Sequence, residues 1–338
     1  MENKGEDELL LARKVDAAAV LACVNREYGW EAKDAILLPG GTENSAWQVT
    51  TPAGIWVAKI FSAREGPVAR VQEENNLYKF LNAHGTHAPE VLDNLKGEDV
   101  SILEFQGAKL PLVVMKFEEL RMCMPATMTQ DELTRIAVAT AKMHKALQEY
   151  PAEKAHTNDR TLDVPKAYTA LTTSVHVKKF SEDELDRYKA IDIQMGEYIQ
   201  GHLQPELLTK TLIHGDLAPE HTRFLPDGSV YFFDFSDRAW APVALEIGIY
   251  FVALHSWGDV PHAHWEKLKE GFLASYESVF PLTKNDVQAI PLFMLYRQLD
   301  VIKYLCSLYK NEPNEHTVNW VRRGYALGEH ILKNYEQR

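Results

Sequence analysis

One pattern constrains this chain more than any other: an apolar segment ending in a His-Gly-Asp loop, followed by a second apolar segment ending in Asp. The first segment leads into His214-Gly215-Asp216, and the second, Tyr231-Phe232-Phe233, leads into Asp234. Short apolar runs bounded by polar residues predict buried strands. The order therefore predicts two carboxylates, Asp216 and Asp234, at the ends of neighbouring strands.

The first third of the chain is predicted to be rich in strands. A helical period covers residues 8–28, and a second helix is expected from about Pro67 to His84. Alternation of apolar and polar residues predicts strands over residues 35–38, 45–49, 55–61, 100–105 and 112–117.

The remainder is predicted to be mostly helical, with a less regular stretch over residues 150–180. One helix opens at Thr129, with Asp131 and Glu132 in its first turn. Further helices are expected over residues 182–202, 265–279, 284–308 and 316–335. These elements give an α+β fold with an N-terminal helix over 1–30, a small antiparallel lobe over 31–118 with one main helix, and a larger α-rich lobe over 119–338.

Composition excludes several classes of function. The formal net charge of −12 argues against a protein that binds along the phosphates of a nucleic acid. It also gives no polybasic patch that would bind a membrane surface. It weakly favours a small substrate that carries an amine, although acidic surfaces more often serve solubility. The longest apolar stretch, 247–254, is too short to span a bilayer, and no signal-peptide core follows the acidic first residues. Three isolated cysteines fit a reducing cytosol, so a cytoplasmic protein is expected.

Two features of the predicted N-terminal lobe suit a nucleotide. Gly40-Gly41 connects two strands, where backbone N–H groups can approach phosphate oxygens, although such a pair is more often a plain hairpin turn. Lys59 lies in an apolar strand and needs a partner or a solvated face. Glu73 on the following helix is the favoured partner because it lies one turn before Leu77, and Glu74 is the alternative.

The acidic pair of the opening pattern suits phosphoryl transfer. Asp216 can accept the proton of an attacking hydroxyl, and Asp234 can hold magnesium on ATP. His214, the other catalytic candidate, is expected to support the loop by hydrogen bonding. Each residue alone could be an ordinary turn residue. The joint order of glycine loop, strand Lys, helix Glu, His-x-Asp and Asp is far less common by chance.

These motifs together resemble those of the aminoglycoside phosphotransferase and choline kinase-like family, a branch of the protein-kinase-like fold, over residues 30–330. Gly40-Gly41-Thr42-Glu43-Asn44 resembles its nucleotide loop, and Val57-Ala58-Lys59 resembles the strand with its lysine. Other similar segments are 139–144, His214-Gly215-Asp216-Leu217 and Phe233-Asp234-Phe235. Tyr276 and Pro281-Leu282-Thr283 are similar to the homoserine kinase and stress-response kinase side of the family.

The resemblance implies a bilobal kinase that uses ATP and Mg²⁺ to phosphorylate a hydroxyl of a small molecule. It implies that Asp216 is the base, that Asp234 is the main metal ligand, and that Lys59 pairs with Glu73. The nucleotide would also contact the loop with Gly40, Gly41 and Asn44, and adenine the backbone of Met115 to Phe117. The acceptor would be an amino alcohol, a hydroxy amino acid, a sugar or an aminoglycoside.

His221 departs from the family pattern, which has Asn at that position. An imidazole can orient Asp216 or bind a second metal ion, although magnesium prefers oxygen ligands. A nucleotide-binding pseudokinase is therefore an alternative. A Ser/Thr protein kinase is a weaker one, since the chain has no activation segment with a recognisable Ala-Pro-Glu end.

The remaining candidates are interpreted as structural. Glu246 is expected to support the loop. His255, His262 and His264 lack a coherent metal-ligand spacing. Tyr296, Arg297 and Asp300 share one helix, where an ordinary ion pair is favoured over a role in acceptor binding.

Overall fold

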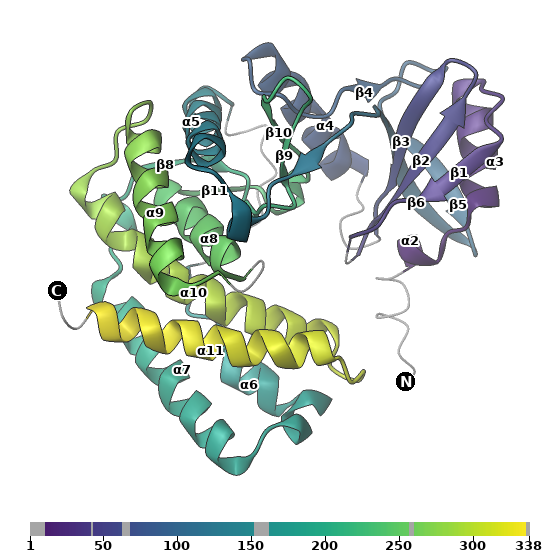
Figure 1. Ribbon diagram of the computed structural model, residues 1–338. Coiled ribbons are helices and arrows are strands. Elements are labelled where there is room, and N and C mark those ends of the chain that lie inside the picture. Colours follow the sequence, from purple (N-terminus) through teal and green to yellow (C-terminus); the bar gives the residue numbers. More distant parts are fainter. Residues whose placement is uncertain (1–10, 42, 63–67, 152–161, 257–259, 336–338) are drawn as a thin grey trace. The chain divides into compact units, whose positions relative to one another are not determined.

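The computed structural model describes residues 11–41, 43–62, 68–151, 162–256 and 260–335 (Figure 1). Contacts divide these residues into two units, each of them built from discontinuous stretches of chain. Unit 1 comprises the described residues of 1–121, 149–156 and 223–236, and unit 2 those of 122–148, 157–222 and 237–338. The boundary expected near residue 118 lies close to the first break, but the segment that carries Asp234 groups with unit 1.

Unit 1 is built on an antiparallel sheet in the order β1-β2-β3-β6-β4, with β5 pairing β6. Its elements are α2 Leu11–Lys14, α3 Ala17–Tyr28, β1 Asp34–Leu37, β2 Ser45–Thr51, β3 Gly54–Ile60, α4 Val68–Ala83, β4 Val91–Leu92, β5 Ser101–Phe105 and β6 Ala108–Lys116. The expected first helix is divided in two because Asp16 caps α3, accepting a hydrogen bond from Ala19 N–H. The expected start of α4 at Pro67 lies outside the described residues.

The two faces of this sheet bury separate clusters, as the two-residue period of a strand requires. Ala58 and Ile60 of β3 lie in the cluster that contains Val20 and Val24 of α3. The opposite face packs Val113 and Met115 against Val71 of α4. Lys59 alternates with Ala58 and Ile60, so the strand directs it toward the α4 face.

Unit 2 is organised around α10, which packs against α6, α7, α8 and α11 (Figure 1). Its helices are α5 Gln130–Leu147, α6 Ala167–Thr172, α7 Glu182–His202, α8 Val243–Ser256, α9 His262–Glu277, α10 Lys284–Leu308 and α11 Glu315–Tyr335. Short 3-10 turns are η1 Pro125–Thr127, η3 Val175–Lys179, η4 Pro205–Leu207 and η5 Phe235–Asp237. The predicted start at Thr129 is confirmed by a capping box with Glu132.

Short strands carry the loops with the two key aspartates. β8 Lys210–Ile213 pairs with β11 Ala239–Pro242, with Ile213 opposite Ala239. β9 Thr222–Phe224 and β10 Val230–Phe232 belong to a second small sheet with β7 Arg121–Met122. Asp216 therefore follows β8 and Asp234 follows β10, each after a strand as predicted. The expectation that the two strands are neighbours is wrong, because β8 and β10 belong to different sheets.

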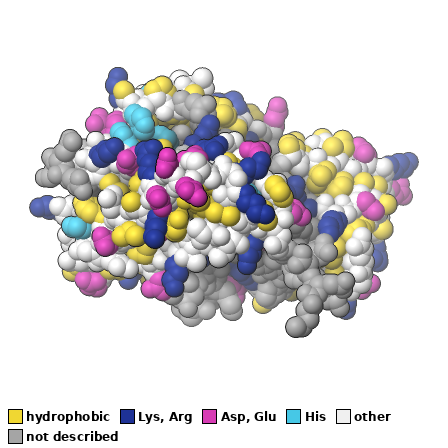
Figure 2. All heavy atoms as spheres, turned by 90° about the horizontal axis from the view of Figure 1, so that it is seen from below, with side chains coloured by type: hydrophobic (Ala, Val, Ile, Leu, Met, Phe, Trp, Pro, Cys, Tyr) yellow, Lys and Arg dark blue, Asp and Glu magenta, His cyan; other side chains and the backbone are white. Residues whose placement is uncertain are grey.

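The charge distribution on the surface and the apolar character of the helices are relevant to the expected absence of nucleic-acid and membrane partners. Over the described residues in the view of Figure 2, acidic and basic side chains are interspersed and form no single acidic patch. Among the described helices, none combines the length and the apolar character needed to cross a bilayer.

Candidate active site

The glycine loop of unit 1 has a backbone that only glycine adopts without strain. Gly40 and Gly41 have φ angles of 106° and 75°, and a Cβ on Gly41 would lie 2.6 Å from the carbonyl oxygen of Asn44. The Asn44 side chain holds the loop in place, because its Oδ1 accepts a hydrogen bond of 2.8 Å from the N–H of Ser62, just beyond β3. The loop is thus fixed beside the end of the strand that carries Lys59.

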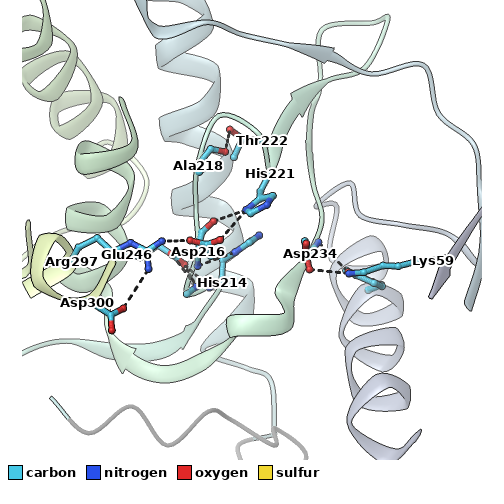
Figure 3. Close-up of polar contacts among 12 residues, drawn as sticks. Lys59, His214, Asp216, Ala218, His221, Thr222, Asp234, Glu246, Arg297 and Asp300 are labelled. Carbon is cyan, nitrogen blue, oxygen red and sulfur yellow. Dashed lines mark hydrogen bonds and ion pairs between the residues drawn. The ribbon is translucent and has the colours of Figure 1, made fainter. Parts of the chain in front are cut away.

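Lys59 lies in a ring of four polar residues within unit 1. Its Nζ is 2.9 Å from Asp234 Oδ1 and 3.6 Å from Glu74 Oε1 (Figure 3). The hydroxyl of Tyr78 donates to Glu74 Oε1 and accepts from the Asp234 N–H at 3.2 Å. Each member therefore contacts two others, so the ring fixes the lysine and the aspartate together.

Glu74, and not the favoured Glu73, is the carboxylate that α4 supplies to Lys59. Glu74 is 2% exposed and lies on the buried side of α4 with Leu77 and Tyr78, whereas Glu73 is partly exposed. Both glutamates lie within one turn of Leu77, so spacing alone could not separate them. Tyr78 is a further member of the site that the sequence pattern did not indicate, although its position four residues after Glu74 places it on the same helix face.

The ring changes the protonation behaviour of the phenol. Burial first, and then the negative charges of Glu74 and Asp234, raise the pKa of Tyr78 well above its ordinary value. Tyr78 is therefore a neutral hydrogen-bond donor and acceptor over the working pH range. Its hydroxyl serves to orient the Glu74 carboxylate and to hold the backbone N–H of Asp234.

Asp234 adopts a backbone conformation that few residues tolerate. Its φ angle is 67°, in the left-handed region where Asp and Asn are several-fold enriched among non-glycine residues. The turn follows β10 directly and leaves the side chain 29% exposed while Lys59 holds one of its oxygens.

The His-Gly-Asp loop of unit 2 is held by one buried carboxylate on α8. Glu246 is fully buried and accepts hydrogen bonds from the backbone N–H groups of His214 and Gly215 (Figure 3). Burial alone would raise the pKa of Glu246, but nearby His144 and His214 and the His214 N–H lower it. The expectation that Glu246 supports this loop is confirmed.

A buried chain of side chains extends this support into the helices. His144 of α5 has Nε2 3.6 Å from Glu246 Oε2 and Nδ1 2.6 Å from the hydroxyl of Tyr276 on α9. His214 is itself fully buried, and its Nδ1 accepts the Asp216 N–H at 3.3 Å. His214 therefore acts on the shape of the loop, as expected.

Gly215 lies so close to the backbone of Asp237, just before β11, that no side chain fits at this position. Its φ angle is 86°, and a Cβ would lie 1.9 Å from the carbonyl oxygen of Asp237. The pairing of β8 with β11 brings these two segments together. The glycine therefore allows the loop that carries Asp216 to pack directly on the backbone.

Asp216 is surrounded by polar groups of unit 2. His221 Nδ1 donates to the backbone carbonyl of Asp216 at 2.8 Å and lies 3.6 Å from its Oδ2. Arg297 of α10 donates from its guanidinium to Oδ1, and it also lies 3.6 Å from Asp300 (Figure 3). The expected ion pair between Arg297 and Asp300 is confirmed. Arg297 also reaches Asp216, a contact that no sequence pattern indicates.

The expected metal ligands differ in how well they suit magnesium. Asp234 offers carboxylate oxygen, the atom type that magnesium prefers, whereas His221 turns Nδ1 toward Asp216. Among the described residues, no group of three His, Cys, Asp or Glu side chains could hold a metal. Magnesium sites of one or two carboxylates completed by phosphate and water need no such group, so the residues present fit that kind of ion.

The expected adenine-binding segment lies at the end of the central strand. Met115 is in β6, in register with Val57 on one side and Val91 on the other. Phe117 is the first residue beyond β6, which ends at Lys116. Of the two candidates, Phe117 is therefore the one whose backbone lies past the sheet pairing.

Comparisons with known proteins agree with these motifs. The model of the phosphotransferase enzyme family, APH, matches residues 34–285. The homoserine kinase of Paramagnetospirillum magneticum is 24% identical over 275 residues, covering 77% of this chain and 79% of that protein. The homoserine kinase of Gluconacetobacter diazotrophicus is 25% identical over 262 residues, covering 75% and 74%.

Solved structures resemble the chain over nearly its whole length. The amicoumacin kinase hAmiN, in complex with AMP-PNP and Ca²⁺, has a TM-score of 0.75 at 16% identity, covering 95% of both chains. A microcompartment-associated aminopropanol kinase has a TM-score of 0.72 at 16% identity, covering 92% of this chain and 96% of that one. These likenesses confirm the expected bilobal, protein-kinase-like fold.

Proposed function

The chain belongs to the phosphotransferase enzyme family and is a kinase, and from this premise we propose that it transfers the γ-phosphoryl group of ATP to a hydroxyl of a small molecule. The observation that supports this most directly is the ring that joins Lys59 and Asp234, with Asp216 on the His-Gly-Asp loop. Relatives named homoserine kinase and aminopropanol kinase favour a small acceptor that carries an amine.

In this proposal Asp216 receives the proton of the acceptor hydroxyl. The hydroxyl oxygen forms a bond to the γ-phosphorus, the bond from that phosphorus to the β–γ bridging oxygen breaks, and ADP leaves with its electron pair. Asp216 suits this role because its side chain is 26% exposed on a loop whose backbone is otherwise buried and held by Glu246. Its carboxylate contacts His221 and Arg297.

The nucleotide side of the reaction falls to residues of unit 1. Lys59 would neutralise phosphate charge, held in place by Glu74, and the N–H groups of Gly40 and Gly41 would face phosphate oxygens. Asn44 fixes that loop, and the backbone beyond Phe117 would meet the base. When bound, magnesium supplies charge neutralisation between the β- and γ-phosphates, and Asp234 is the residue that would hold it.

The proposal is tested by ADP release in the presence of magnesium and a panel of amino alcohols, hydroxy amino acids, sugars and aminoglycosides. We expect Asp216→Asn to lower turnover by roughly 10²–10⁴-fold, because the proton acceptor is lost. The same variant should bind ATP as tightly as the parent in calorimetry. Asp234→Ala should instead weaken the ATP binding that depends on magnesium.

Three outcomes would count against the proposal. Equal turnover by Asp216→Asn would remove the base. ATP binding without turnover of any acceptor would favour the pseudokinase alternative. Faster turnover with GTP than with ATP would overturn the choice of donor.

A further inference from the structure

The carboxylate proposed as the base is held by a partly buried arginine from a distant helix. Arg297 belongs to α10 and donates to Asp216 Oδ1 across 81 residues of sequence. Its side chain is 19% exposed, and all the groups concerned lie in unit 2. A guanidinium that is largely shielded from water is stabilised by a negative partner.

This contact opposes the chemistry assigned to Asp216. A carboxylate that binds a cation is a weaker proton acceptor, since the cation favours its charged form. The other carboxylate oxygen lies 3.6 Å from His221, so cationic or donor groups face Asp216 on two sides. Oδ1 of Asp216 is open to an acceptor hydroxyl only when Arg297 loosens this contact.

Arg297 cannot move its charge into an apolar environment, so it needs a substitute anion. Asp300 lies 3.6 Å away and supplies part of the compensation. Burial lowers the pKa of Arg297, but the charges of Asp216, Asp300 and Asp237 more than offset it and raise the pKa overall. The guanidinium has five N–H donors in a planar fork, and it can hold a second carboxylate through two parallel hydrogen bonds.

We propose that Arg297 determines acceptor specificity by binding a carboxylate on the acceptor, and that this contact replaces its hold on Asp216. This rests on the proposed kinase function and narrows it to acceptors that carry a carboxylate beside the hydroxyl. An acceptor without that group leaves Arg297 on Asp216 and is phosphorylated less efficiently. Arg297 is then both the recognition residue and the group that sets the state of the base.

Matched acceptors separate this role from a purely structural one. Homoserine and 3-aminopropan-1-ol share the hydroxyl and the amine and differ in the carboxylate, as do serine and 2-aminoethanol. For at least one pair, we expect the parent protein to prefer the carboxylate-bearing member in kcat/KM. Arg297→Gln should lower kcat/KM for that member by roughly 10–100-fold, as expected for one charge-assisted contact. It should not lower kcat/KM for the amino alcohol, which loses only the contact that occupies Asp216.

Two further variants act as controls. Arg187→Gln removes an exposed arginine of α7 that pairs with Glu329 of α11. This variant should leave kcat/KM for both acceptors unchanged. Arg297→Lys keeps the charge but not the planar fork, so it should restore part of the preference. Equal losses for both members of a pair in Arg297→Gln, or a parent preference for the amino alcohols, would overturn the proposal.

A binding measurement does not depend on turnover. L-2-aminobutyrate has the carboxylate and amine of homoserine but no hydroxyl, so it can bind without reacting. With a non-hydrolysable ATP analogue present, calorimetry should detect its binding to the parent and a loss of roughly tenfold or more in Arg297→Gln. Equal binding to both proteins, or none to the parent, would refute the role of Arg297. Turnover of no acceptor together with this loss would refute the kinase proposal alone.

Discussion

The contact between Gly215 and Asp237 gives the most direct test of how the loop that carries Asp216 is built. Gly215→Ala adds one methyl group, which would lie 1.9 Å from the carbonyl oxygen of Asp237. Side-chain Cβ atoms essentially never approach closer than 3.0 Å, so one of the two segments must move by about 1 Å. Since Asp237 precedes β11, which pairs with β8, that movement strains both strands.

Two contributions to the cost can be separated. Placing alanine at a φ of 86° costs roughly 1–2 kcal/mol, offset by about 0.4–1 kcal/mol because alanine restricts the unfolded chain. The steric overlap adds about 1–3 kcal/mol, as overpacking does elsewhere. We expect a total loss of roughly 2–4 kcal/mol in unfolding free energy. A shift of about 1 Å in a catalytic group can also lower turnover by about 10²-fold.

A second glycine isolates the backbone contribution. Gly97 has a φ angle of 77° and nothing within 4 Å of the position of a Cβ. Gly97→Ala therefore carries the backbone cost without the overlap, and it should lose about 1 kcal/mol or less with unchanged turnover. Urea unfolding and ADP release measure the two effects. If Gly215→Ala loses no more stability than Gly97→Ala and keeps its turnover, the close packing described here is wrong.

Two other substitutions test the buried polar groups. Tyr78→Phe removes the hydroxyl between Glu74 and Asp234 and should cost about 1–3 kcal/mol in urea unfolding; an unchanged midpoint would contradict the ring. Glu246→Gln should cost about 2–4 kcal/mol near pH 7, because it removes a charged acceptor of two N–H groups. The folded-state pKa of Glu246 is lowered, so its charge stabilises the protein above the ordinary value of 4.5, and this benefit disappears as the pH falls through the lower folded value. In thermal unfolding, the difference in stability between the parent and Glu246→Gln should therefore become smaller below about pH 4. A difference that grows there would contradict the lowered pKa of Glu246.

Much of the architecture could be predicted because local patterns set it. Strand alternation identifies β2, β3 and β6, and the predicted ranges of α7 and α10 agree with the structure. Helix α8 was recognised only as an apolar run, since Val243 to Leu254 are all buried and such a helix has no amphipathic period. Burial on all sides removes the signal that reveals a helix at the surface.

The site residues that could be predicted are those placed by their order along the chain. Those placed by the packing of one helix against another element could not be predicted. Lys59, Asp216 and Asp234 follow from their positions at or within strands. Which of the two adjacent glutamates faces Lys59 depends on how α4 is rotated about its axis relative to β3. The sequence of α4 does not reveal this rotation. The contact of Arg297 with Asp216 depends on how α10 packs in unit 2, and no spacing in the sequence encodes it.

The grouping of residues 223–236 with unit 1 has a consequence for the order in which the chain can mature during synthesis. The sheet of unit 1 ends with β6 at Lys116, so its strands can pair early. The ring of Lys59, Glu74 and Tyr78 nevertheless lacks its fourth member until Asp234 has been made. Until then the Lys59 ammonium has only Glu74 from this ring. The nascent unit 1 is therefore a sheet whose polar ring is completed only after residues 122–148 and 157–222 of unit 2 have been synthesised.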